Sequence, residues 1–304
     1  MKKIPLGTSL ASAPIALGCM RISGMEEKKA EALIQTALDN GIDLFDHADI
    51  YGGGESERLF GRILKNNPGM RARMLVQGKC GICKGYYDAS KEHIIKAVDG
   101  ILDRLKISEL DILLLHRPDA LMDPEEVAEA FTMLKKSGKV KHFGVSNQNA
   151  AQLALLDSFM PGKLIANQLQ FGLAHTGPVD TGINVNTLND QAVMRDGSVL
   201  DFCRLHKITI QAWSPFQHGW FEGPFLNSDK YQKLNALIRT MAEEKGVTDT
   251  AIAVAWIMRH PAKMQTIVGT TNEQRLLDIV KAADVTLTRP EWYSLYLAAG
   301  NPLP

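Results

Sequence analysis

The sequence predicts an α/β fold, a closed (β/α)8 barrel with an extra helix near its carboxyl end, formed by one domain over residues 1–304. Eight short apolar runs each precede a segment with helical periodicity. The runs are continuous rather than alternating, as expected for parallel strands covered on both faces. Eight β-α repeats favour a closed barrel over an open doubly wound sheet, whose usual G-x-G-x-x-G turn is missing from the sequence.

The predicted elements follow one another with helix start and stop signals. Gly41 ends the first helix, Ser90 is the N-cap of the third, and the fourth begins at Asp123 with Pro124 in its first turn and ends at Gly138. The predicted strands are 15–20, 42–48, 73–80, 110–119, 140–147, 164–171, 208–216 and 264–270. Their helices are 25–41, 56–66, 90–106, 123–139, 149–159, 198–207, 231–246 and 272–283.

Three segments do not belong to this repeat. Residues 248–261 are expected to form an extra helix before the last strand, and residues 289–300 a final helix that covers part of the barrel mouth. The segment 172–196 is rich in Gly, Asn, Thr and Asp, and we expect a long loop there, of a kind that often carries function.

Composition excludes several classes of protein. The formal net charge is zero, so neither a nucleic acid nor an anionic membrane surface is an expected partner. We expect no signal peptide, because the first residues lack a long apolar region, and no membrane-spanning segment. Four cysteines in a chain of this length are typical of reduced thiols in the cytoplasm rather than of disulfides.

Polar residues gather at the carboxyl ends of the predicted strands, the face that carries function in such barrels. Seven consecutive strands, from the second to the eighth, end in this way. No comparable set lies at the opposite ends, so we expect these side chains to meet. They are Asp46 with Tyr51 beyond it, Lys79, His116, Ser146 and Asn147, Gln168, Trp213 and Ser214, and Gly269 and Thr270.

Each of these residues also has an ordinary structural explanation. Asp46 alone suits a turn, Tyr51 a packed ring, Lys79 a solvated cation and His116 a structural histidine. Four such groups at one barrel mouth suggest proton transfer instead. An ammonium lowers the pKa of a neighbouring phenol, a carboxylate keeps the ammonium charged, and an imidazole can orient a carbonyl oxygen.

The quartet and its surroundings resemble the aldo-keto reductase family. The motif around the first two residues reads "DHADIYG", the lysine motif "VQGKCG" and the histidine motif "LLLHRPD". Further matches are "GVSN", "ANQ", "AWSPF" and "IVGTTNEQR", in order over essentially the whole chain. The resemblance implies Tyr51 as general acid, Lys79 and Asp46 as the groups that tune it, and His116 as the residue that directs the substrate oxygen.

The resemblance also implies a nicotinamide cofactor, NADP (NADPH), with NAD possible. Ser146, Asn147 and Gln168 would hold the carboxamide, and Trp213 would stack on the nicotinamide ring. Arginine suits a phosphate dianion because it donates two parallel hydrogen bonds. The remaining cofactor residues are Ser214, Pro215, Phe216 and Gln217 near the pyrophosphate, and Gly269, Thr270, Thr271 and Arg275 near the 2′-phosphate.

Three positions depart from the family pattern. His47 replaces a small residue, and an additional glycine makes Glu55 a looser match. Gly269 stands where many members have a phosphate-binding lysine, which weakens the preference for NADP over NAD. Arg275 still favours NADP.

Other interpretations of the same segments are weaker. Gly52-Gly53-Gly54 lacks the Lys-Ser/Thr of a phosphate-binding loop, so we expect a flexible loop. A metal site from Asp46, His47, Asp49 and His116 is disfavoured because His47 should point away from Asp46. Cys80 and Cys83 form a C-x-x-C without a second pair, which favours incidental thiols.

We therefore expect reversible reduction of an aldehyde or ketone, with a small-molecule carbonyl substrate; the sequence does not identify a partner protein. One alternative is a slow cofactor-sensing subunit, like the relatives of this family that associate with ion channels. A second is a Schiff-base aldolase using Lys79, disfavoured because a nucleophilic amine must be neutral. Met20 is assigned to the cofactor and substrate pocket, and further substrate contacts are guessed at Tyr86, Tyr87, His175, His218 and Trp220.

Overall fold

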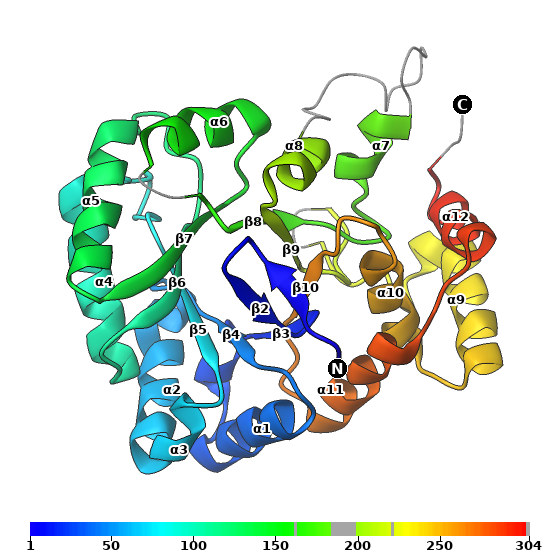
Figure 1. The fold of residues 1–304 in the computed structure, drawn as a ribbon. Coiled ribbons are helices and arrows are strands. Elements are labelled where there is room, and N and C mark those ends of the chain that lie inside the picture. Colours follow the sequence, from blue (N-terminus) through cyan, green and yellow to red (C-terminus); the bar gives the residue numbers. More distant parts are fainter. Residues whose placement is uncertain (161–162, 184–198, 220–221, 302–304) are drawn as a thin grey trace.

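The computed structural model describes residues 1–160, 163–183, 199–219 and 222–301, which contain a closed barrel of eight parallel strands. The order around the ring is β10-β3-β4-β5-β6-β7-β8-β9, so strands adjacent in sequence are adjacent in space (Figure 1). The barrel predicted from the sequence is confirmed. Its strands are β3 (Ile15–Gly18), β4 (Leu44–Asp46), β5 (Leu75–Cys80), β6 (Leu110–Leu115), β7 (Val140–Ser146), β8 (Ala166–Gln170), β9 (Thr209–Trp213) and β10 (Gln265–Val268).

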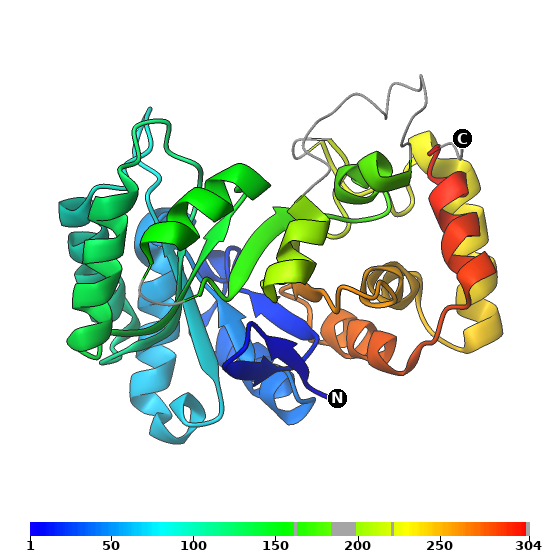
Figure 2. The same ribbon diagram turned by 45° about the horizontal axis from the view of Figure 1, so that its top comes forward.

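Helices follow the strands and cover the outside of the barrel (Figures 1 and 2). The predicted caps are present: the Ser90 hydroxyl accepts from the backbone N–H of His93, and the Asp123 carboxylate from that of Glu125. The helices after the first six strands are α1 (Glu27–Asp39), α2 (Glu55–Asn66) with the short α3 (Pro68–Arg71), α4 (Lys91–Leu105), α5 (Pro124–Lys136), α6 (Ala150–Phe159), and α7 (Gly177–Ile183) with α8 (Val199–His206).

Two helices lie between β9 and β10, and the one that packs on the barrel is not the one that the sequence predicted. The expected extra helix, α10 (Asp249–Met258), is apolar on all sides and is the one packed against β10 and α11 (Glu273–Val280). The helix α9 (Gln232–Lys245) lies outside it (Figure 1). An amphipathic helix needs only one buried face, whereas a helix with apolar residues all round must be enclosed.

The final helix α12 (Arg289–Ala298) packs on α9 and on Trp256 of α10, whose ring stacks on Trp292 at 4.6 Å. None of the described residues of α12 lines the pocket at the barrel mouth, so the prediction that this helix covers the mouth is wrong. The apolar residues of α12 are used against α9 and α10 instead. The expected loop 172–196 contains α7, and its residues 184–196 lie outside the described part of the chain.

An antiparallel hairpin, not predicted from the sequence, precedes the barrel. It consists of β1 (Ile4–Leu6) and β2 (Leu10–Ser12), and Figure 1 shows it lying across the middle of the strand ring. Leu6 is fully buried among the residues that fill the barrel interior. Gly7, at φ +61°, has room for no side chain, since a Cβ there would lie 2.6 Å from Cβ of Ile165. The hairpin therefore closes the amino-terminal end of the barrel.

Two apolar clusters form the core. The smaller fills the barrel interior, and the larger lies between the strands and the surrounding helices. Within the part of the chain that the structure describes, no helix is both long enough and apolar enough to cross a bilayer. The interior cluster consists of Leu6, Ala16, Leu44, Ile112, Leu114, Ile165, Ala166 and Ile267.

Candidate active site

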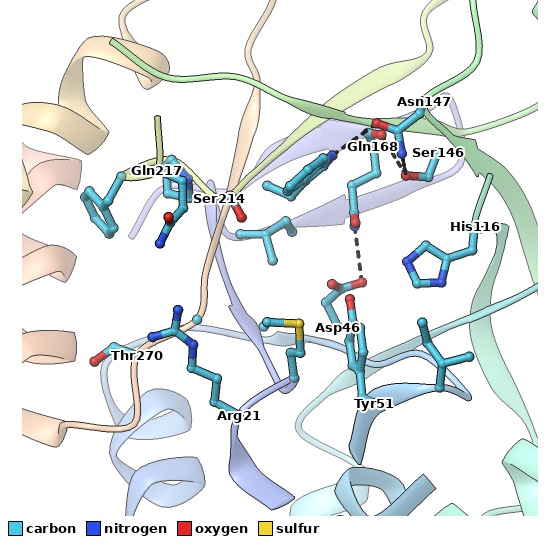
Figure 3. A pocket seen from close by; sticks show the side chains of 18 of the residues that line it. Arg21, Asp46, Tyr51, His116, Ser146, Asn147, Gln168, Ser214, Gln217 and Thr270 are labelled. Atoms are coloured by element: carbon cyan, nitrogen blue, oxygen red, sulfur yellow. Dashed lines mark hydrogen bonds between the residues drawn. The ribbon is translucent and has the colours of Figure 1, made fainter. Parts of the chain in front are cut away.

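A pocket of about 560 Å³ opens at the carboxyl ends of the barrel strands. Figure 3 shows Asp46, Tyr51 and His116 on one side of it, with Ser214 and Thr270 on the other. Most of the residues predicted from the sequence line it, so the structure brings them together. They are Met20, Asp46, Tyr51, His116, Ser146, Asn147, Gln168, Trp213, Ser214, Pro215, Phe216, Gln217, Gly269, Thr270 and Arg275.

Lys79 lies directly behind this surface, at the end of β5, and its side chain is fully buried. Its Nζ donates to Oδ2 of Asp46 at 2.7 Å, to the backbone oxygen of His47 at 2.9 Å and to Oη of Tyr51 at 3.0 Å. An ammonium has three N–H donors, and all three have an acceptor here. The lysine therefore holds the phenol and the carboxylate in a fixed relation.

The charges of this group follow from burial and pairing. Burial disfavours the ammonium of Lys79, but Asp46 and Tyr51 favour it more strongly, so the pKa of Lys79 is raised. Burial also raises the pKa of Tyr51, and the charge of Lys79 offsets only part of this effect. The ammonium acts in the expected direction, yet the net shift of the phenol is upward. Lys79 is a cation and Tyr51 keeps its proton at neutral pH.

A line of buried amides holds the carboxylate of Asp46 from below. Oδ1 of Asp46 accepts from Nε2 of Gln77 at 2.6 Å and from Nε2 of Gln168 at 3.2 Å. Gln77 and Gln211 exchange hydrogen bonds of 2.9 and 3.0 Å, and Gln211 donates to Gln265 at 2.8 Å. Gln77, Gln211 and Gln265 were not predicted as part of the site, although a glutamine inside an apolar strand indicates a buried hydrogen-bond partner. The line satisfies the buried carboxylate through the barrel interior.

His116 is buried at the end of β6, with its ring edge-on to Tyr51 at a centroid distance of 6.0 Å. Its Nδ1 is buried without a hydrogen-bond partner among the described residues. Burial, together with the charges of Lys79 and Arg117, lowers the pKa of His116 to about 2. The imidazole is therefore neutral, so one of its nitrogens can donate a hydrogen bond and the other can accept one.

The departure from the family pattern at His47 is accommodated in the core. Its ring packs edge-on against Phe60 at 4.5 Å, and both ring nitrogens are buried without a partner among the described residues. Burial and the charge of Lys79 lower the pKa of His47 to about 3. His47 thus contributes its backbone oxygen, not its ring, to the site.

Polar side chains at the ends of β7, β8 and β9 form a hydrogen-bonded chain along one wall. Nε1 of Trp213 donates to Oδ1 of Asn147 at 3.3 Å, and Nδ2 of Asn147 donates to Oγ of Ser146 at 2.8 Å. Oγ of Ser146 donates to the backbone oxygen of Gln168 at 2.9 Å. Asn147 has a φ of +59°, a conformation that asparagine tolerates better than most residues. Hydrogen bonds thus connect the side chains of this wall, which presents an indole and amides to the pocket.

The far end of the pocket is basic. Arg21 and Arg275 both line it, together with the hydroxyls of Ser214 and Thr270. Figure 3 shows the guanidinium of Arg21 directed toward the space between Gln217 and Thr270. Two guanidinium groups and two hydroxyls in one pocket lining suit a phosphorylated ligand. The chemistry of the pocket thus fits a dinucleotide, because its lining combines amides and an indole with the guanidinium groups of Arg21 and Arg275.

Several predicted contacts are not part of the pocket. Thr271 is exposed and does not line it, whereas its neighbour Thr270 is buried and does. Of the guessed substrate contacts, only Met20 lines the pocket. Trp220 lies outside the described residues. The guesses not found at the pocket are Tyr86, Tyr87, His175 and His218.

Part of the pocket wall was not predicted from the sequence. Arg117 directly follows His116 and lies with its guanidinium carbon 5.7 Å from the centroid of the Trp213 ring. Its position immediately after a strand end is the signal that could have identified it. The other missed residues are Gly18, Arg21, Ile50, Gly52, Ile82, Pro224 and Ile267.

The described residues do not form the phosphate-binding loop or the metal site that were considered as alternatives. Gly52 to Gly54 form a short turn with positive φ at each glycine rather than a phosphate-binding loop that leads into a Lys-Ser/Thr pair. Asp46 is bonded to Lys79, Gln77 and Gln168, while the ring of His47 packs on Phe60, so these residues do not converge as metal ligands.

Comparison with known proteins agrees with the geometry. The model of the aldo/keto reductase family matches residues 14–295. The uncharacterized oxidoreductase YcsN of Bacillus subtilis (strain 168) is 35% identical over 318 residues, with 100% of both chains covered. The 6-dehydroglucose reductase of Agrobacterium fabrum is 34% identical over 312 residues, with 98% of each covered. The chain belongs to the aldo/keto reductase family, and the resemblance found in the sequence is confirmed.

A solved structure shows the same fold. The aldo-keto reductase from Klebsiella pneumoniae, crystallised in complex with NADPH, aligns with a TM-score of 0.80. It is 24% identical in sequence, and the match covers 99% of this chain and 96% of that one. The (β/α)8 architecture is therefore shared between the two proteins.

Proposed function

We propose that this protein is an NADP(H)-dependent carbonyl reductase that interconverts an aldehyde or ketone and the corresponding alcohol, with Tyr51 as general acid. The observation that carries the proposal is the position of Lys79. Its ammonium lies 3.0 Å from Oη of Tyr51 and 2.7 Å from Asp46. A phenol that gives up its proton here becomes a phenolate beside a fixed cation, which stabilises the negative charge.

The reduction balances with one hydride and one proton. When bound, the reduced nicotinamide supplies a hydride to the carbonyl carbon. Oη of Tyr51 donates its proton to the carbonyl oxygen as negative charge develops there, and Lys79 stabilises the phenolate that remains. In the oxidation direction the same phenolate accepts the proton of the alcohol. Asp46 keeps the ammonium charged throughout.

His116 is proposed to orient the substrate. The neutral imidazole can donate a hydrogen bond to the carbonyl oxygen without adding a charge to the pocket. Its ring stands edge-on to Tyr51, so both side chains can address one oxygen atom. This arrangement favours protonation of the oxygen by Tyr51 over protonation by solvent.

The cofactor would lie along the wall from Trp213 to Arg275. Ser146 and Asn147 would hold the carboxamide, Trp213 would stack on the nicotinamide, and Ser214 to Gln217 would approach the pyrophosphate. Arg21 and Arg275 support NADP over NAD, because an additional phosphate needs additional cations. The related reductase of known structure, which was crystallised with NADPH, supports the same choice.

The lining at the substrate end of the pocket suits a carbonyl compound that has both apolar and polar parts. Ile50 and Ile82 supply apolar surface, and Arg117 supplies a cation beside Trp213. A relative that matches 98% of this chain is named a 6-dehydroglucose reductase, so sugar aldehydes belong in the substrate panel. The buried, ion-paired state of Lys79 opposes the aldolase alternative, since a Schiff base needs a neutral amine.

Two experiments test the proposal. The first is titration of the protein with NADPH and with NADH, followed by cofactor fluorescence. The second compares wild type and Tyr51→Phe in turnover of a panel of carbonyl compounds. We expect tight NADPH binding in both proteins and turnover reduced by about 10²–10⁴ in the variant. Unchanged turnover in Tyr51→Phe would remove the assigned acid. Tight cofactor binding without turnover of any carbonyl would point to the slow, cofactor-sensing alternative, and borohydride trapping of a substrate on Lys79 to an aldolase.

A further inference from the structure

A second cluster of chemically active side chains lies beside the pocket, in the segment that joins β5 to α4. It contains Cys83, Asp88 and His93, which are all partly buried and whose ligand atoms lie within 4.8 Å of one another. We propose that these three residues form a binding site for a divalent cation of the zinc class. The site is distinct from the proposed catalytic group and rests on no part of the proposed function.

The geometry is that of three donors around one point. Sγ of Cys83 lies 4.0 Å from Nδ1 of His93, and Oδ2 of Asp88 lies 3.7 Å from the same nitrogen. Tetrahedral Zn²⁺ with bonds of about 2.0–2.3 Å places its ligand atoms roughly 3.3–3.6 Å apart. The three side chains therefore need to move inward by only a fraction of an ångström to about 1 Å.

The rival interpretation is an activated thiol, in which His93 acts as base and Asp88 orients it. That arrangement uses the two ring nitrogens separately, one toward the nucleophile and the other toward the carboxylate. Here the thiol and the carboxylate both face Nδ1. Three ligands that converge on one point suit a shared cation, whereas a relay needs them in a line.

The backbone holds the ligands before any ion arrives. Ile82 and Tyr87 form an antiparallel bridge, the Cys83 N–H donates to the Tyr86 oxygen at 3.0 Å, and the Asp88 N–H to the Gly81 oxygen at 3.0 Å. These bonds close a hairpin that carries Cys83 on one arm and Asp88 on the other. The ligand spacing along the chain is C-x4-D-x4-H.

Side-chain bonds complete the arrangement. Oδ1 of Asp88 accepts from the backbone N–H of Ser90 at 3.0 Å, which leaves Oδ2 directed at His93. Ser90 is also the N-cap of α4 and accepts from the His93 N–H, so the histidine is fixed in the first helical turn. A site built on a closed hairpin and a capped helix loses little conformational freedom when it binds an ion.

Ligand type and charge indicate which ion fits. A thiolate, an imidazole and a carboxylate are all zinc ligands, and thiolate disfavours Mg²⁺ and Ca²⁺. The thiolate and the carboxylate together neutralise a dication. Three protein ligands leave one coordination position for water. Ile82, adjacent to Cys83, lines the catalytic pocket, so an ion bound here would fix the segment that carries part of the substrate wall.

Cobalt serves as the spectroscopic probe, because tetrahedral Co²⁺ has intense visible bands and a thiolate adds a near-ultraviolet charge-transfer band. Chelator-treated, reduced full-length protein is titrated with Co²⁺ and then with Zn²⁺. We expect one Co²⁺ per chain with the charge-transfer band, displaced by Zn²⁺. Cys83→Ser should abolish the band, and Asp88→Asn and His93→Gln should weaken binding about tenfold or more.

Matched controls are available on neighbouring elements. His142→Gln on β7 and Asp103→Asn on α4 change the same residue types outside the cluster and should leave Co²⁺ binding unchanged. Should Cys83→Ser fail to fold, alkylation of wild type gives a second measurement, since Zn²⁺ should protect Cys83 from iodoacetamide. Absence of the band at saturating Co²⁺, its persistence in Cys83→Ser, or alkylation of Cys83 at an unchanged rate in Zn²⁺ would overturn the proposal.

Discussion

The Nζ atom of Lys79 lies 3.0 Å from Oη of Tyr51, and the same ammonium is bonded to the Asp46 carboxylate at 2.7 Å. Asp46 and Lys79 are buried, and Tyr51 is partly buried at the edge of the pocket. A buried cation between a carboxylate and a phenol is stable only as a complete set, because each charge depends on its partner. This relationship has consequences for stability as well as for chemistry.

Substitution Lys79→Met should destabilise the fold strongly. It leaves the carboxylate of Asp46 buried without its cation, at an expected cost of about 3–5 kcal/mol in the free energy of unfolding. Urea denaturation followed by tryptophan fluorescence measures this change. Lys91→Met is the matched control, since the ion pair of Lys91 with Glu129 is solvent-exposed and should matter little. Equal, small effects in both variants would contradict the buried ion pair.

Activity should not depend on protonation of His116 between pH 5 and 8. Because the pKa of this histidine is lowered to about 2, the imidazole is neutral over the whole range. We expect the pH profile of kcat/KM for carbonyl reduction to lack a step near the usual histidine pKa of about 6.5. A step in wild type that disappears in His116→Gln would show that the imidazole titrates after all.

The stability of the protein should fall as the pH decreases below about 6.5, in part because of His47. Its folded pKa of about 3 lies below the unfolded value, so the unfolded chain binds a proton first as the pH falls. The free energy of unfolding should then decrease by up to about 1.4 kcal/mol per pH unit for each such histidine. Comparing wild type with His47→Leu between pH 4 and 7 isolates this contribution; parallel curves would refute it.

Arg275→Gln should weaken NADPH binding more than NADH binding. If the guanidinium contacts the 2′-phosphate, its loss should raise the Kd for NADPH about tenfold or more and leave the Kd for NADH nearly unchanged. Fluorescence titration of both cofactors measures the ratio. Arg239→Gln, on the outer helix α9, controls for general charge effects. An equal change for both cofactors would place Arg275 away from the phosphate.

Gly7→Ala should destabilise the amino-terminal closure of the barrel. The residue has a φ of +61°, and a Cβ would lie 2.6 Å from Cβ of Ile165, so both backbone and packing resist the change. We expect a loss of more than about 1 kcal/mol. Gly69→Ala is the control, because a Cβ there meets nothing within 4 Å. Thermal denaturation measures the midpoint of unfolding of each variant. Similar midpoints would argue against close packing of the hairpin on the barrel.

The barrel could be predicted from the sequence because its signals are local. Apolar runs, helical periodicity and caps such as Ser90 and Asp123 are properties of neighbouring residues. The hairpin was missed for the same reason. Each of its strands has three residues, and what fixes it is distant: Leu6 in the barrel interior and the Gly7 N–H bonded to Thr209 at 2.8 Å.

The site residues that could be predicted from the sequence were likewise those with a local signal. Residues at strand ends, such as Asp46 and His116, could be expected at the pocket because the fold places every strand end on one face. Arg21 and Ile82 lie on loops, whose course no local signal specifies. The net pKa shift of Tyr51 was also not predictable, because it depends on how deeply the phenol is buried.

The glutamines inside the barrel have a direction. The Asp46 carboxylate can only accept hydrogen bonds, so Gln77 must direct its amide nitrogen toward Asp46. This choice fixes the amide orientation of each following glutamine as far as Gln265, which accepts from Gln211. The amide nitrogen of Gln265 donates to the backbone oxygen of Ala13 at 2.7 Å. Turning one amide over would set two oxygens face to face and force its neighbours to follow. The orientation of the Asp46 carboxylate beside Lys79 is thus coupled, through this chain of amides, to the amino-terminal end of the barrel. There the amino-terminal hairpin meets the first barrel strand.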